Sequence, residues 1–128
     1  MTLNKIHHIA IICSDYNKSK KFYVEDLGLQ PMREEFRAER NSYKLDLALN
    51  GEYIIELFSF PNPPTRATRP EATGLRHLAF EVDDLEKSIS WMAEKGIKAE
   101  PIRIDGITQK KFTFIFDPDN LPIELYQK

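Results

Sequence analysis

The sequence predicts an α+β fold built from two βαβββ modules in tandem, and three features of the chain predict it. The first is an internal repeat. When His8 is set over His77, five of the fifteen positions from 8 to 22 are identical to those 69 residues later, where average composition predicts about one. The second is that strand and helix periodicities follow one another in the same order in both halves. The third is a proline-rich stretch between the halves.

A length of 128 residues suits one domain made of both modules. We expect the first module at residues 1–60 and the second at 74–128. The stretch 61–73 contains four of the eight prolines and is expected to be an extended connector that neither sheet continues through.

Within each half, an apolar strand is expected first, at Lys5–Cys13 or Leu75–Val82, followed by a helix that ends at Gly28 or Gly96. Turn signals then separate three further strands. After the helix the repeat resumes with an offset of 68 instead of 69 residues, so the first helix is expected to be one residue longer. The N-cap candidates are Ser14, Asp15, Asp83 and Asp84, and Phe22 and Trp91 are expected to be packing residues at matched helix positions.

Composition narrows the class of protein. A net charge of −2 and a pI near 5.9 provide no excess of positive charge for binding nucleic acid. The longest apolar run is five residues, Ile9–Cys13, far short of a membrane-spanning helix, and no export signal is expected. Cys13 is the only cysteine and cannot form an intrachain disulfide, so a cytoplasmic protein is expected.

The repeat places the same polar residues in apolar surroundings twice. Glu56 lies within Tyr53–Phe58 and Glu124 within Pro122–Tyr126, where an unpaired carboxylate would cost several kcal/mol. Because side chains alternate along a strand, these two glutamates can face away from the helices, together with His8 and His77.

Two neutral imidazoles and two carboxylates carry a charge of −2, which balances a divalent cation. Such a ligand set suits Ni, Co, Mn, Fe(II) or Zn and leaves one or two coordination positions open for water or substrate. The alternative is that each is an ordinary strand residue, a hydrogen-bonded histidine or a solvated glutamate. His7 aligns with Arg76 and is expected to be a neighbour at the surface or on the back of the sheet, and Glu81 aligns with Ile12 and is expected to be a rim charge.

Each module has a set of characteristic motifs. The first has His8-Ile-Ala-Ile, Asp15, Ser19, Phe22-Tyr23 and Leu27-Gly28-Leu29; the second has Arg76-His-Leu-Ala-Phe-Glu-Val-Asp-Asp-Leu and Asp117-Pro-Asp-Asn-Leu-Pro-Ile-Glu-Leu. These motifs resemble those of the vicinal oxygen chelate superfamily, which includes glyoxalase I, bleomycin-resistance proteins and extradiol dioxygenases. The resemblance covers nearly the whole chain. It implies that the sheets of the paired modules curve into a cup around a metal, with the helices outside, often in a homodimer.

The resemblance also implies site residues. His8, Glu56, His77 and Glu124 match the four metal-ligand positions of bacterial glyoxalase I, which favours the lyase and isomerase branch of the superfamily. Glyoxalase I usually has an Arg and an Asn that touch glutathione four residues after its first and second ligands. Ile12 and Phe60 stand there in this chain, so dependence on glutathione is doubtful.

The leading hypothesis is a metal-dependent lyase or isomerase acting on a small substrate with vicinal oxygens through an enediolate. By analogy Glu124 is the base, with Glu56 as a possible partner across the substrate. The alternatives are an Fe(II) extradiol-type dioxygenase and a non-enzymatic protein that binds a toxin or antibiotic. The residues expected to line the substrate pocket are Ile12, Phe58, Phe60, Ala79 and Tyr126.

Overall fold

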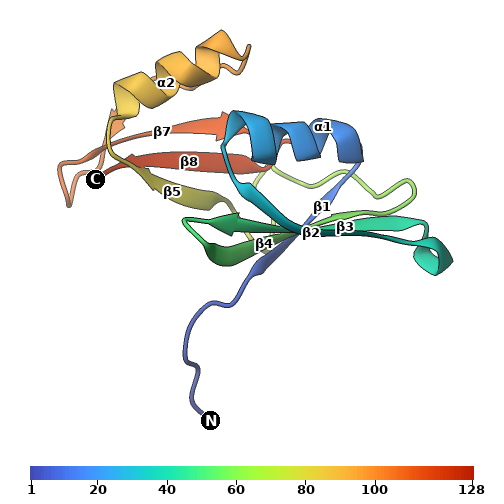
Figure 1. Cartoon of the computed structure of the whole chain (residues 1–128). Coiled ribbons are helices and arrows are strands. Elements are labelled where there is room, and N and C mark those ends of the chain that lie inside the picture. The colour runs from blue at the N-terminus through green and yellow to red at the C-terminus, as the bar shows by residue number, and fades with distance from the viewer. The chain divides into compact units, whose positions relative to one another are not determined.

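The structure is a computed structural model that describes all 128 residues, and it divides into two compact units, Met1–Thr65 and Arg66–Lys128. Both have the predicted βαβββ order, which confirms the α+β fold class (Figure 1). The first unit contains β1 (Ile9–Cys13), α1 (Tyr16–Lys21), the π-helix η1 (Phe22–Asp26), β2 (Gln30–Arg37), the 3₁₀ turn η2 (Ala38–Arg40), β3 (Ser42–Leu49) and β4 (Glu52–Ser59). The second contains β5 (Leu78–Val82), α2 (Leu85–Glu94), β6 (Arg103–Ile104), β7 (Lys111–Phe116) and β8 (Pro122–Gln127).

The two sheets have the same topology. Their strand orders are β1-β4-β3-β2 and β5-β8-β7-β6. In each sheet the first strand pairs in parallel with the last, and the remaining pairs are antiparallel. The registers also correspond, because Ala10 lies opposite Glu56 and Ala79 lies opposite Glu124.

One face of each sheet is covered by the helix of its own unit, as α2 shows beside β5, β8 and β7 in Figure 1. Ile55 and Leu57 of β4 are 1% and 0% exposed, and Ile123 and Leu125 of β8 are 0% and 3% exposed. The residue between each pair is a glutamate. Side-chain alternation therefore places these glutamates on the face of each sheet that the helix leaves uncovered.

The helical segments differ by one residue, as the change of repeat offset predicts. From the N-cap Asp15 to Gly28 is 13 residues, and from the N-cap Asp84 to Gly96 is 12. The extra residue is accommodated by the π turn, in which the Leu27 N–H donates to the carbonyl of Phe22 at 2.9 Å. A π turn holds one residue more than an α turn, so the later residues regain the register of the repeat.

The starts of two strands and the burial of Trp91 differ from what the sequence predicts. The strands β1 and β5 begin at Ile9 and Leu78, later than expected, so each histidine directly precedes its strand. In the second unit, the register of β5 with β8 begins at Ile123, because the preceding Pro122 has no N–H to donate to β5. Trp91 is 50% exposed, whereas its counterpart Phe22 is 4% exposed. Trp91 lies about 100° around α2 from the buried Met92, and the Lys95 ammonium covers its ring at 4.3 Å.

None of the helices has the length and hydropathy to cross a bilayer.

Candidate functional site

In the first unit, a histidine and a glutamate meet on the face of the sheet opposite the helix. Nε2 of His8 lies 3.1 Å from Oε1 of Glu56, whose side chain is 15% exposed. His8 comes from the segment leading into β1, and Glu56 comes from the adjacent β4. The pairing is what the sequence predicts for this half.

The second unit repeats this arrangement with its own residues. Nε2 of His77 lies 3.0 Å from Oε2 of Glu124, and the glutamate side chain is again 15% exposed. Neither unit by itself brings a third His, Cys, Asp or Glu side chain to its pair in a way that would hold an ion. The meeting of all four predicted ligands at one ion stays a prediction.

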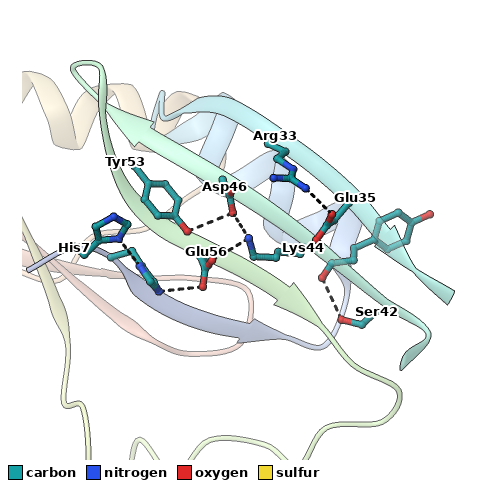
Figure 2. A network of polar contacts seen from close by, with 10 residues as sticks. His7, Arg33, Glu35, Ser42, Lys44, Asp46, Tyr53 and Glu56 are labelled. Atoms are coloured by element: carbon teal, nitrogen blue, oxygen red, sulfur yellow. Dashed lines mark hydrogen bonds and ion pairs between the residues drawn. The ribbon is translucent and has the colours of Figure 1, made fainter. Parts of the chain in front are cut away.

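Glu56 belongs to a larger polar network that the sequence analysis missed (Figure 2). Nζ of Lys44 lies 3.0 Å from Oε2 of Glu56 and 2.9 Å from Oδ1 of Asp46, and the Tyr53 hydroxyl donates to the same Asp46 oxygen at 3.4 Å. Burial alone would raise the pKa of Glu56, but hydrogen bonds from Tyr53 and Lys44 outweigh it and lower that pKa. Side-chain alternation along β3 could have predicted this network, because it places Ser42, Lys44 and Asp46 on the same face of the sheet as Glu56.

The second unit has aromatic residues where the first has this charged network. Phe114 lies opposite Glu124 in the strand register, as Asp46 lies opposite Glu56. The Phe114 ring contacts the His77 ring edge-on, with 5.1 Å between centroids. Glu124 therefore has His77 as its only ion-pair partner, whereas Glu56 has a lysine as well.

His7 is exposed, as expected of a surface residue, and it also contacts the predicted ligand His8. Its Nδ1 lies 2.8 Å from Nδ1 of His8, so one of these nitrogens donates a hydrogen bond to the other (Figure 2). Its ring also meets the Tyr53 ring edge-on at 5.3 Å. The contact links adjacent residues and has no counterpart in the repeat, which is why the comparison of the two halves did not reveal it.

The residues predicted to line the substrate pocket are divided between the two units. In the first unit, Ile12 lies opposite Phe58, and Phe58 stacks on Phe60 at 5.8 Å. The surroundings of these two rings are not purely apolar, because the guanidinium of Arg37 lies over Phe58 at 5.1 Å and that of Arg40 lies over Phe60 at 5.2 Å.

In the second unit, Ala79 lies opposite Glu124. Tyr126 follows Glu124 by two residues, and its hydroxyl donates to Asp105 at 3.0 Å and contacts Thr108. Neither Ala79 nor Tyr126 lines the cleft of about 340 Å³ that opens beside His77.

Comparison with known proteins identifies the superfamily of this chain. The model of the Glyoxalase/Bleomycin resistance protein/Dioxygenase superfamily matches residues 5–125. The chain belongs to this superfamily. Among the relatives of this superfamily member is YwkD of Bacillus subtilis, which is 66% identical over the full length of both chains. The crystal structure of the glyoxalase family protein from Enterococcus faecalis has a TM-score of 0.91 and 49% identity, covering 99% of this chain and 100% of the other.

A relative with a named activity is more distant. The lactoylglutathione lyase of Schizosaccharomyces pombe is 30% identical over 98% of this chain, which corresponds to 48% of the lyase. The superfamily therefore contains relatives that are named as enzymes.

Proposed function

We propose that this superfamily member is a divalent-metal-dependent lyase or isomerase with His8, Glu56, His77 and Glu124 as its metal ligands. The observation that supports this most is the repeated pair: each unit brings one imidazole nitrogen and one carboxylate oxygen within 3.1 Å or less. A duplication that kept only packing residues would not need to keep both pairs.

The spacing of the donor atoms suits a shared ion. Two ligands at about 2.1 Å from one metal and at right angles to each other are about 3 Å apart. Both observed His–Glu distances, 3.1 and 3.0 Å, match this separation. Lys44 contacts Oε2 of Glu56 and leaves Oε1 directed to His8, so the ammonium does not occupy the oxygen that an ion would share with the imidazole.

The different surroundings of the two glutamates suggest different roles. Glu56 is held as an anion by Lys44 and Tyr53, which suits a fixed ligand. Glu124 lies opposite Phe114 and has only His77 as an ion-pair partner, so fewer contacts would have to break for it to move. We therefore assign Glu124 as the base that removes a carbon-bound proton from the substrate.

The proposed substrate is a small molecule with vicinal oxygens, and proton removal gives an enediolate. When bound, the metal would supply Lewis-acid stabilisation of the negative charge that develops. Ile12 and Phe60 replace the polar residues that hold glutathione in glyoxalase I, so a substrate other than a glutathione adduct is proposed.

Metal analysis tests the proposal directly. Protein purified without chelator should contain about one equivalent of Ni, Co, Mn, Fe or Zn per ligand set. EDTA should lower the melting temperature, and added metal should restore it, because a ligand that binds only the native state stabilises that state. Replacing any one of the four ligands by Ala, which removes the ligating atom, should remove this response, and Glu81→Ala, which changes an exposed glutamate on β5, should preserve it.

Two outcomes would favour the other functions. Iron with oxygen consumption on catechols would indicate an extradiol-type dioxygenase. Protein that contains no metal, and whose melting temperature responds to neither EDTA nor added metal, would contradict the proposal and favour a binding protein.

A further inference from the structure

The cleft beside His77 in the second unit contains an unusual concentration of arginine. Three arginines line it, Arg69, Arg76 and Arg103, together with two glutamates, Glu71 and Glu100. Its volume of about 340 Å³ suits a small molecule.

The glutamates neutralise these arginines only loosely. Arg69 and Glu100 approach to 3.9 Å, as do Arg76 and Glu71, and both distances exceed hydrogen-bond length. Arg103 has no carboxylate within 4.0 Å in the second unit. The cleft therefore keeps cationic N–H donors that its own acidic residues do not satisfy.

Two phenylalanines of β7 fix Arg103 in position. Its guanidinium carbon lies 5.1 Å from the Phe112 ring centroid and 5.3 Å from that of Phe114. Contact with the flat faces of rings restrains the plane of a guanidinium and leaves its N–H edges available for an oxyanion. Phe114 also contacts His77, so a single ring links Arg103 to the His77–Glu124 pair.

The first unit has no such arginine at the matching position. Arg103 is paired with Phe112 in the strand register, and the equivalent pair in the first unit is Glu35 and Lys44. Glu35 there makes an ion pair of 3.2 Å with Arg33, and Lys44 is paired with Asp46 and Glu56. The charge of this position is thus reversed between the halves, which is unexpected if the residue only stabilised the repeated fold.

We infer that the cleft of the second unit binds an oxyanion group, a carboxylate or a phosphonate-type phosphorus oxyanion, with Arg103 as its main donor and Arg69 as a second one. A planar guanidinium can donate two parallel hydrogen bonds to either group. That the oxyanion belongs to the enzyme's substrate rests on the proposed function, which places the reacting end at the adjacent His77–Glu124 pair. The substrate class is then a small anionic compound.

Two small probes with matched carbon skeletons test the site, acetate for a carboxylate and methylphosphonate for a phosphorus oxyanion. Each is titrated into metal-free protein while the arginine Nε–Hε signals are followed by NMR. We expect saturable binding of at least one probe, with the Arg103 signal among those that shift. Arg103→Gln should weaken that binding about tenfold or more, and Arg103→Lys should weaken it less, because the charge is kept and the bidentate geometry is lost.

Lys87→Gln provides the matched control, because it removes one positive charge from an exposed residue of α2 in the same unit. Its probe affinity should equal that of the wild type. The inference is overturned if neither probe binds saturably, or if Arg103→Gln and Lys87→Gln bind the probes equally well. Metal binding is measured separately on the same proteins, so a failure of the proposed metal site leaves this result intact, and the reverse also holds.

Discussion

The ammonium of Lys44 lies 3.0 Å from the carboxylate of Glu56. It also lies 2.9 Å from Asp46, which is directly opposite Glu56 in the strand register. One lysine thus lies between two carboxylates, 15% and 16% exposed, that would otherwise face each other. Mutual attraction with Asp46 and Glu56 outweighs the effect of burial and raises the pKa of Lys44.

Removing this lysine should therefore destabilise the protein. Lys44→Met leaves two like charges opposite each other, and we expect a loss of about 1–3 kcal/mol in the free energy of unfolding without metal. The double variant Lys44→Met/Asp46→Asn should recover much of this loss, since one of the two charges is gone. Urea unfolding of the single and double variants measures both effects. Equal destabilisation in the two variants would show that repulsion between Asp46 and Glu56 is not the cause of the loss.

The two glutamates should respond differently to the loss of their charge. Glu124→Gln is expected to abolish turnover while keeping most of the metal affinity, because the amide oxygen can still ligate but the group no longer accepts a proton. Glu56→Gln should instead weaken metal binding, since the anion that Lys44 and Tyr53 hold in place is lost. Metal titrations and rates on the same preparations separate these effects. Full activity in Glu124→Gln would rule out its role as the base.

His7 should orient the proposed ligand His8 through the contact between their Nδ1 atoms. Such a second hydrogen bond fixes the tautomer of a ligating imidazole, and its loss commonly weakens metal binding about 10- to 100-fold. We expect this for His7→Phe, which keeps a ring against Tyr53 but has no hydrogen-bonding nitrogen. His7→Asn should retain much of the affinity because its amide can replace Nδ1. Equal metal affinity in both variants would show that the contact has no such role.

The repeated features of this molecule could be read from the sequence. The order of elements, the N-caps Asp15 and Asp84, the extra residue before Gly28 and both His–Glu pairs all follow from comparing one half with the other. Periodicity and repetition act together here, because each module must bury the same face under its own helix.

What could not be predicted is what differs between the halves. Lys44 and Asp46 correspond to Phe112 and Phe114. Comparing the two halves of the sequence therefore indicates neither the charged pair nor the aromatic pair. The contact of His7 with His8 depends on side-chain directions just outside a strand, which alternation does not determine. These unmatched residues give the two glutamates different surroundings.

Stability in acid should depend on Glu34 of β2, which lies on the helix side of the first sheet. Hydrogen bonds from Lys20 and Tyr16 of α1 lower its pKa from an ordinary value of 4.5. A carboxylate with a depressed pKa in the folded state contributes stability above pH 4.5, and that contribution is lost as the pH falls through its folded pKa.

Glu34→Gln should therefore lower the melting temperature at pH 7 and have little effect at pH values below the folded pKa. At pH 7 the free energy of unfolding should fall by about 1 kcal/mol or less. The effect is small because both partners of the Lys20–Glu34 ion pair are more than one third exposed, so solvent screens their attraction. Glu39→Gln, which changes an exposed glutamate of the η2 turn, is the matched control and should show no such pH dependence. A melting-temperature difference that is the same at both pH values would mean that Glu34 acts through packing and not through its charge.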